Sequence, residues 1–261
     1  MINKSRITNH KLRITNYKLQ MKRLISAIQF LTILPIGKPG TFDKNMIVFF
    51  PVIGLILGMM LMIFDLAVSR LWTAPVAAVL DVIFLVILTG ALHLDGLGDT
   101  ADGLYGNRPK EKALVIMKDS RIGAMGLVAV VCGLAVKWGG VMSLDAHRSL
   151  LLFIIPAYAR GGMLFGFRFL EYGRPDGGTG HAFFGETLKF SAFRALLIPV
   201  FVSFFAGRRG LWLNVVFFIT TVLILWFYKK RMGCITGDML GAMCEITESM
   251  LFLMVSIGGR L

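Results

Sequence analysis

Long apolar runs recur along this chain and constrain its fold more than any other feature. A helix needs ~20 largely apolar residues to cross the hydrocarbon core of a bilayer. The runs that approach this length are residues 47–68, 75–92, 122–138, 150–169, 192–206 and 211–228. A soluble domain of 261 residues does not need 56% hydrophobic residues, and only 16% of this chain is charged. The sequence therefore predicts an all-α fold, a polytopic integral membrane bundle of about 6–8 transmembrane helices.

The first twenty residues differ from the rest of the chain. They contain the near-repeat RITNHKL and RITNYKL, and they hold basic residues but no acidic one. We interpret residues 1–20 as a disordered basic extension, and as a candidate mis-assigned start for which Met21 is the natural first residue. Residues 21–261 then form a single membrane-embedded domain. Its first segment, residues 24–34, predicts a short amphipathic helix at the membrane interface that ends at Pro35.

The charge of the chain points to anionic partners at a membrane. A formal net charge of +13 suits loops at an anionic cytoplasmic leaflet, contact with membrane lipid and a site for anionic small molecules. Nucleic acid is not expected as a partner, because the basic residues are scattered between the membrane segments. The three cysteines form no CxxC pair, so neither a disulfide framework nor a zinc site is expected. The sequence leaves open whether the protein is a homo-oligomer.

An acidic stretch, residues 92–123, follows the second apolar run directly. Its Asp95, Asp99 and Asp102 lie at positions i, i+4 and i+7, which places them on one face of a helix. Carboxylates side by side repel one another unless a cation neutralises them, and Mg²⁺ binds one or two carboxylates together with substrate phosphates. The pattern predicts a metal–phosphate site with these three acids as ligands. The alternative is that they are solvated acids at the level of the lipid headgroups.

A second acidic cluster opens the last apolar segment. Asp238, Glu245 and Glu248 share one helical face. Acids at a helix N-terminus are favoured by the macrodipole, which explains Asp238 better than the glutamates further inside. Between the two clusters lies a Gly-rich loop, residues 169–190, whose Arg174 is a candidate contact for phosphate. A simple connector is the alternative for this loop.

Three features lie inside the predicted spans. Gly54 and Gly58 form a small-xxx-small pattern that predicts close packing against another helix. Arg160, near the middle of its span, predicts a partner among the acids or a substrate phosphate, with a structural ion pair as the alternative. Asp81 is interpreted as an acid near the membrane surface opposite the acidic stretch.

The distribution of basic residues predicts the topology. Counted from a cytoplasmic N-terminus, the loops after the second, fourth and sixth spans lie on one side, and they are richer in Lys and Arg than most of the others. Arg208 and Arg209, on the other side, are an exception. We therefore expect a multi-pass protein of the cell inner membrane, in which both acidic clusters and the Gly-rich loop converge on the cytoplasmic face.

Three motifs resemble one known family. The motifs are HLDGLGDTADGL (His93–Leu104), EKALVIMKDSRIGAMG (Glu111–Gly126) and RMGCITGDMLGAMCEITE (Arg231–Glu248), and they resemble the cobalamin synthase family of adenosylcobinamide-GDP ribazoletransferases. The resemblance runs from Met21 to the C-terminus. It departs from the family pattern at Gly98, Cys234 and Met239, where Ala, Gly and Thr are expected. The change at Cys234 bears on the backbone just before Asp238.

The resemblance implies a Mg²⁺-dependent phosphotransferase of late vitamin B12 biosynthesis. Such an enzyme joins adenosylcobinamide-GDP to α-ribazole or α-ribazole 5′-phosphate and releases GMP. We assign Mg²⁺ ligation to Asp95, Asp99 and Asp102, one of which is also a candidate acceptor of the hydroxyl proton. His93 is an alternative base, although its place on the membrane side of the acids favours a structural role. The expected substrate-binding residues are Arg121, Arg160, Lys118, Arg174, Asp238, Glu245 and Glu248, and the last three are also candidates for a second ion.

Two other functions compete with this one. A CDP-alcohol phosphotransferase also places acids on helices near the cytoplasmic surface and uses Mg²⁺, but the signature D-G-x-x-A-R of that class is not found in the sequence. An ion-coupled transporter would use the acids as a translocation pathway. We see no clear inverted repeat, which counts modestly against it.

Overall fold

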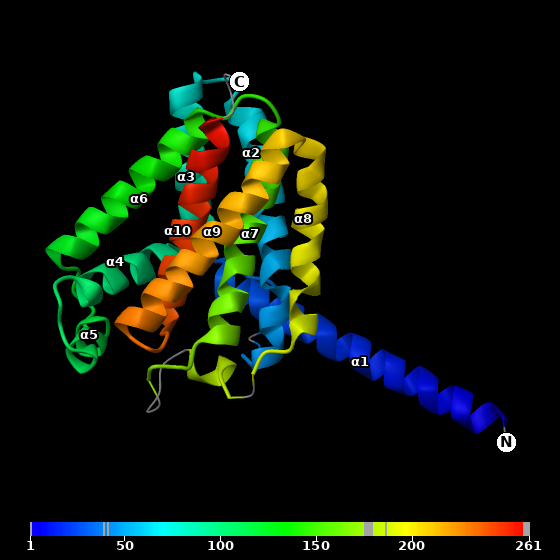
Figure 1. Cartoon of the computed structure of the whole chain (residues 1–261). Helices are drawn as coiled ribbons and strands as arrows, with labels where there is room; N and C mark the ends of the chain where they lie inside the picture. Colours follow the sequence, from blue (N-terminus) through cyan, green and yellow to red (C-terminus); the bar gives the residue numbers. More distant parts are fainter. Residues whose placement is uncertain (1, 39, 41, 175–179, 186, 258–261) are drawn as a thin grey trace.

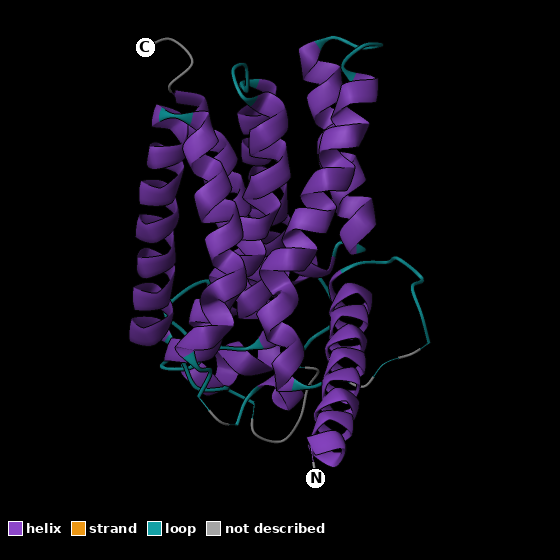
Figure 2. Ribbon diagram, turned by 90° about the vertical axis from the view of Figure 1, so that its right-hand side faces the viewer, coloured by secondary structure: helices purple, strands orange, loops and turns teal. Residues whose placement is uncertain are grey.

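The computed structural model describes residues 2–38, 40, 42–174, 180–185 and 187–257. These residues form helices and connecting loops, and the β pairing among them is a single bridge between Tyr172 and Ile235. Figure 2 shows helices running side by side as a bundle. The all-α fold predicted from the apolar runs is therefore confirmed.

The elements follow the predicted segments closely. The longer helices are α1 (Ile2–Leu31), α2 (Phe50–Val68), α3 (Ala74–Thr89), α4 (Leu92–Leu104), α6 (Ala124–Met142), α7 (Arg148–Phe169), α9 (Arg208–Arg231) and α10 (Gly237–Val255). The shorter ones are η1 (Lys44–Phe49), α5 (Lys110–Ile116), η2 (His181–Phe183), η3 (Phe190–Leu196), α8 (Leu197–Ser203) and η4 (Phe204–Ala206).

Length and composition single out the helices that can cross a membrane. In the described part of the chain these are Lys44–Val68, Ala124–Met142, Arg148–Phe169 and Arg208–Arg231, and α3 with α4 makes a fifth if this pair, bent by 90°, is one broken span. The predicted span over residues 192–206 is instead a shorter series of 3₁₀ and α segments, Phe190–Ala206. Pro199 lies in that series and cannot donate a backbone hydrogen bond.

Helix α7 is the centre of the bundle. In its apolar window 83% of the residues are buried inside the protein, against 22–44% in the other three spanning candidates. Helices α2, α9 and α10 surround it (Figure 1). Helix α4 turns across the end of the bundle where α10 begins. We call this the α4 end, and we call the end where α7 begins the opposite end.

The glycine pattern in α2 serves packing against α7, as predicted. A Cβ atom at Gly54 would overlap the backbone of Ala157, and one at Gly58 would overlap the backbone of Phe153. The two helix backbones therefore touch at these positions, which requires a residue without a side chain.

Replacing Gly58 by Ala is therefore expected to lower stability by roughly 1–3 kcal/mol, the usual range for overpacking. Gly139→Ala is the matched control, because a Cβ atom there would meet no neighbour within 4 Å. Thermal unfolding in detergent measures both. Equal melting temperatures for the two variants would show that α2 and α7 can separate without cost.

The N-terminal segment differs from its prediction. Residues 2–20 continue the same helix, α1, whose C-terminal part packs Ala27, Ile28 and Leu31 into the core. No Gly or Pro interrupts the chain from Ile2 to Leu31, so nothing in the local sequence ends the helix. In Figure 1 the early part of α1 projects away from the bundle.

Candidate active site

The first part of the acidic stretch forms α4, which leaves the direction of α3 through a sharp turn. Gly90 and Ala91 both have left-handed backbone angles, with φ of 59° and 57°. A glycine takes this conformation without strain, whereas an alanine rarely does. The turn bends the chain by 90°, so α4 lies across the bundle and is not itself one of the four long apolar spans.

Helix α4 packs directly on the start of α10 through two glycines. A Cβ atom at Gly96 would meet the backbone of Asp238, and one at Gly241 would meet the backbone of His93. The close approach brings Asp95 and Asp99 of α4 beside Asp238 of α10. Two acidic segments more than 130 residues apart in sequence therefore meet, as the topology analysis predicted.

Asp99 is the electrostatic centre of this group. Its pKa is raised to about 6, first by burial and then by the negative charges of Asp95 and Asp238, while Arg174 acts in the opposite direction. Asp95 is exposed and Asp99 is partly buried. A set of carboxylates that repel one another to this extent favours the arrival of a cation.

Asp102 has a different role from the other two acids of α4. Its carboxylate accepts hydrogen bonds from the backbone N–H groups of Gly123 and Gly126, at 2.7 and 2.8 Å. These donors belong to the N-terminus of α6, where N–H groups have no partner inside the helix. Asp102 therefore ties the end of α4 to the start of α6.

This contact leads to a prediction that separates the acids. Asp102→Ala is expected to lower the free energy of unfolding by about 1–2 kcal/mol, the scale of a lost helix cap. Asp95→Ala, at an exposed position on the same helix, is the control and is expected to leave the melting temperature in detergent nearly unchanged. An unchanged melting temperature for Asp102→Ala would contradict the capping role.

The donor set fits Mg²⁺ only together with a substrate. Among the described residues, no group of three His, Cys, Asp or Glu side chains is placed to hold a metal ion. The trio Asp95, Asp99 and Asp102 thus stays a prediction as a ligand set. Mg²⁺ ordinarily binds one or two carboxylates and completes its coordination with phosphate oxygens and water. The neighbouring pair Asp95 and Asp99 can supply the carboxylates.

Basic residues border the acids on two sides. On the α10 side, Arg174 donates to Asp238 at 2.7 Å. On the α6 side, Arg121 forms a two-pronged pair with Asp119, at 3.0 and 2.6 Å, which holds the pKa of Asp119 at about 2. Lys118 is exposed. The predicted phosphate contacts Arg121 and Arg174 therefore lie at the α4 end, each already paired with an acid.

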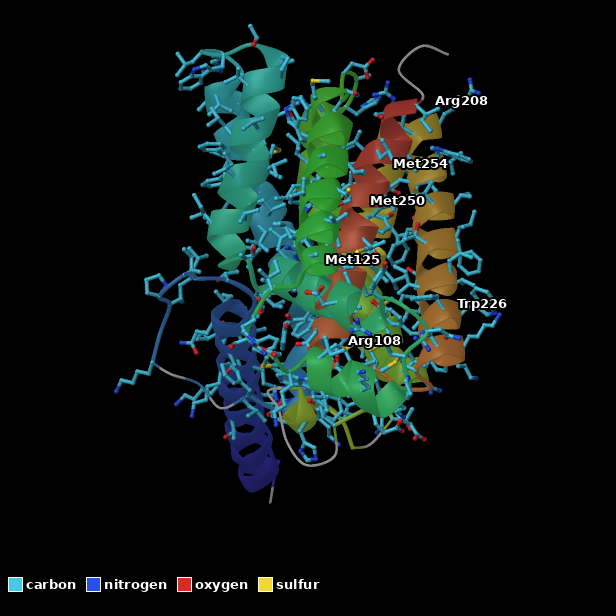
Figure 3. All side chains as sticks on the ribbon, turned by 90° about the vertical axis from the view of Figure 1, so that its left-hand side faces the viewer. Arg108, Met125, Arg208, Trp226, Met250 and Met254 are labelled. Atoms are coloured by element: carbon cyan, nitrogen blue, oxygen red, sulfur yellow. The ribbon has the colours of Figure 1, made fainter. Side chains whose placement is uncertain are left out.

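A hollow of about 540 Å³ opens beside Asp102. Its lining includes Tyr105 and Arg108, from the loop between α4 and α5, and Asp119 and Arg121, from the loop before α6. Figure 3 shows Arg108 and Met125 toward this end of the molecule and Arg208 at the other. Arg108 was not among the predicted site residues, although it follows the acids by only six positions.

Other predicted residues lie inside the bundle rather than at its end. Glu248 accepts hydrogen bonds from Arg160 and, at 2.7 Å, from Lys137, while Glu245 accepts from Lys137 at 2.5 Å. All four side chains are buried. His93 is buried near this network, and neither ring nitrogen has a partner among the described residues. The partner of Arg160 is thus an acid of α10, and substrate contacts of Arg160, Glu245 and Glu248 stay predictions.

Lys137 was missed by the sequence analysis. A lysine near the end of an apolar helix resembles a side chain that reaches for the membrane surface. The structure shows a different role, because the side chain of Lys137 is buried, with only 2% exposed. A buried lysine requires an acidic partner, and the two glutamates of α10 provide it.

Asp81 lies far from the acids of α4, as interpreted from the sequence. It accepts a hydrogen bond from Arg148 at 2.8 Å, and Arg148 also holds Asp65. Arg148 begins α7 at the opposite end of the bundle. Asp81 therefore belongs to a separate ion-pair group.

Comparison with known proteins gives a consistent result. The sequence model of a family described as cobalamin-5-phosphate synthase matches residues 23–256. A protein of Alkaliphilus metalliredigens named adenosylcobinamide-GDP ribazoletransferase is 38% identical over 92% of this chain and 98% of its own length. Proteins with the same name from Clostridium acetobutylicum and Acetivibrio thermocellus are 32% and 34% identical, each over 90% of this chain and over 95% and 97% of their own lengths. No solved structure matches the chain.

Proposed function

Because this chain belongs to the cobalamin-5-phosphate synthase family, we propose that the acids at its α4 end perform the transfer for which its relatives are named. The reaction joins adenosylcobinamide-GDP to α-ribazole or its 5′-phosphate and releases GMP, in the assembly of the nucleotide loop of vitamin B12. The observation that carries the assignment to a site is the convergence of Asp95, Asp99 and Asp238 from two distant helices, with arginines on both flanks.

The reaction requires little covalent chemistry from the protein, because the bonds that form and break belong to the two substrates. The 3′-hydroxyl oxygen of ribazole forms a bond to the phosphorus attached to cobinamide, and the bond from that phosphorus to the oxygen of GMP breaks. GMP leaves with the electron pair. Positioning of the two substrates and stabilisation of negative charge therefore supply most of the catalysis.

Each group at the α4 end has a role in that scheme. Asp95 and Asp99 would hold Mg²⁺, which neutralises charge on the phosphates when it is bound. Arg108 and Arg121 orient the pyrophosphate from the hollow beside α4. Asp99, partly buried beside Asp95 and Asp238, would also accept the proton of the attacking hydroxyl.

We assign the α4 end to the cytoplasmic face of the cell inner membrane. The loops at this end carry Arg108, Arg121 and Arg174, and the last turn of α9 carries the run Lys229–Arg231. Basic residues that flank membrane spans stay preferentially on the cytoplasmic side. The substrates are charged and the corrinoid is large. An open site at the membrane surface suits both properties.

A product assay on the purified full-length protein tests the function. With adenosylcobinamide-GDP, α-ribazole 5′-phosphate and Mg²⁺, we expect GMP and the completed cobalamin phosphate in equal amounts, and EDTA should abolish both because the carboxylates then lack their cation. Excess Mg²⁺ added after EDTA should restore the rate. Undiminished GMP release in EDTA would remove the metal from the proposal.

The same assay distinguishes the competing functions. CMP release from a CDP-alcohol, with no reaction of adenosylcobinamide-GDP, would indicate the other membrane transferase class. Ion-coupled flux in liposomes without chemical conversion would indicate a transporter.

A further inference from the structure

A second and larger cavity lies at the α4 end, on the side of Arg174. Its volume is about 950 Å³, and it shares no lining residue with the hollow beside Asp102. Its walls come from η1, the end of α7, and the described parts of the segment that leads to η3. The established family reaction does not by itself assign anything to this cavity.

The cavity is strongly basic. Among the described residues, its lining holds the cations Lys44, Arg168, Lys189 and Arg194 and the acid Glu171. In the part of the chain that the structure describes, no salt bridge involves Arg168, Lys189 or Arg194. The Nε atom of Arg168 is buried without a hydrogen-bond partner among those residues. The guanidinium of Arg168 lies over the rings of Phe169 and Phe190, at 5.4 and 4.9 Å from their centroids. Cations without an acidic partner around a concave surface attract an anion such as a phosphate.

The inner wall of the cavity is aromatic. The ring of Phe184 lies 5.0 Å from that of Phe167 and stacks on that of Tyr172 at 4.8 Å, between ring centroids. The ring of His181 is 6.0 Å from that of Tyr172. A wall of this kind accepts a flat ring system by stacking. The cavity thus combines the two features that an aromatic nucleoside phosphate requires.

The cavity is tied to the acids by a short stretch of backbone. Next to Tyr172, the N–H of Gly173 donates to the carbonyl of Ile235 at 2.9 Å, and the N–H of Ile235 donates to the carbonyl of Glu171. Two residues beyond Tyr172, Arg174 binds Asp238. A ligand seated against Tyr172 is therefore next to the acid group that contains Asp99.

We propose that this cavity binds the acceptor, α-ribazole 5′-phosphate, with its phosphate among Arg168, Lys189 and Arg194 and its benzimidazole ring against Phe184 and Tyr172. The inference rests on the proposed function and adds a subsite to it. In-line transfer requires the acceptor and the leaving GMP to approach the phosphorus from opposite sides. The cavity adjoins the acids through Tyr172 and the Arg174–Asp238 pair, whereas the hollow adjoins them through Asp102, so the two substrates can reach the acids through different residues.

The chemistry of its walls favours the benzimidazole of the acceptor substrate as the occupant of the cavity, and not the guanine of the donor substrate. Benzimidazole has no exocyclic donor and keeps only one ring-nitrogen acceptor once the ribose is attached, so a wall of phenylalanine rings leaves few of its polar groups unpaired. Guanine carries a polar edge that would lose its hydrogen bonds against such a wall. In the hollow on the other side, the carboxylate of Asp119 offers an acceptor for that edge, while Arg108 and Arg121 remain for the pyrophosphate.

The test compares charge removal with ring removal in the purified full-length protein. In Lys189→Gln/Arg194→Gln, the KM for α-ribazole 5′-phosphate should rise ~10-fold or more, the scale of lost charged hydrogen bonds, while the KM for unphosphorylated α-ribazole stays unchanged. In Phe184→Leu, the KM values for both forms should rise together. Arg208→Gln, an exposed change at the opposite end, is the control.

Direct binding keeps the result separate from the proposed function. The affinity for α-ribazole 5′-phosphate, measured without adenosylcobinamide-GDP, should fall in the double variant, and inorganic phosphate should compete only with the wild type. Wild-type binding without any product would overturn the proposed function and leave the cavity assignment standing.

Three outcomes would overturn the inference. A rise in the KM for adenosylcobinamide-GDP alone would assign the cavity to the donor. Unchanged KM values for both substrates would show that the cavity is not part of the active site. Loss of binding to vesicles that contain anionic lipid, with unchanged kinetics, would assign the basic residues to a lipid headgroup.

Discussion

Asp99→Asn is expected to lower kcat at least ~100-fold, the scale for removing one key electrostatic group from an active site. The substitution keeps the size of the side chain but removes its negative charge. The charges of Asp95, Asp238 and Arg174 all act on the pKa of Asp99. Removing the charge of Asp99 therefore changes the electrostatic field of the whole group. No buried partner is lost, and the melting temperature in detergent should change little.

The matched control is Asp145→Asn, the same chemical change at the opposite end, where Asp145 pairs with Arg209. Initial rates of GMP release under saturating substrates measure both variants. The control should retain wild-type turnover. If purified and folded Asp99→Asn turns over at a near-normal rate, Asp99 has no place in the metal or proton-transfer role.

Glu248→Gln is expected to produce the largest loss of stability, about 3–5 kcal/mol, because it leaves the buried Arg160 without its counter-charge and removes one of the two acids that hold Lys137. Glu248 is fully buried and serves both Arg160 and Lys137. Glu245→Gln should cost less, since Glu245 contacts only Lys137, which keeps Glu248 as a partner. In thermal unfolding in detergent, the melting temperature of Glu248→Gln should therefore be lower than that of Glu245→Gln, and both should be lower than that of the wild type.

Two further variants make this prediction sharp. Glu111→Gln changes an exposed glutamate on α5 and should leave the melting temperature unchanged. The double variant Arg160→Met/Glu248→Met removes both charges of the tightest pair and should recover much of the loss, while Lys137 remains paired with Glu245. A double variant no more stable than Glu248→Gln would show that the network acts by something other than charge balance.

The buried network has a consequence for the site. Glu245 and Glu248 connect α10 to α6 and α7, and α10 also carries Asp238 at its start. Helix α4 rests on the same start of α10 through Gly96 and Gly241. The network thus fixes the helix against which the catalytic acids pack, without reaching the α4 end itself.

The local part of the site was predictable from residue spacing. Acids at i, i+4 and i+7 must share a face if the segment is helical, and α4 is helical over all three. The small-xxx-small pattern of Gly54 and Gly58 likewise predicted a close helix contact. Both arguments need only the geometry of one helix.

The roles of individual residues were less predictable. The face shared by Asp95, Asp99 and Asp102 did not reveal that Asp102 is held by amides of Gly123 and Gly126, more than twenty residues later. Nor did spacing show that α10 divides its acids between the α4 end, for Asp238, and the interior, for Glu248. A shared helical face fixes the direction in which the side chains point around the helix axis. It does not fix how far along the helix, and so how deep in the bundle, each side chain lies.

The sequence by itself determined the helical membrane class, the helix faces and the family, because hydropathy and motif spacing are properties of short segments. Only the tertiary structure decided which charges meet. Arg160 and Glu248 are 88 positions apart and Lys137 and Glu248 are 111 apart, and the pairing of such charges depends on which helices become neighbours. The turn at Gly90 and Ala91 is the clearest case, since it places α4 across the bundle and so brings Asp99 to Asp238.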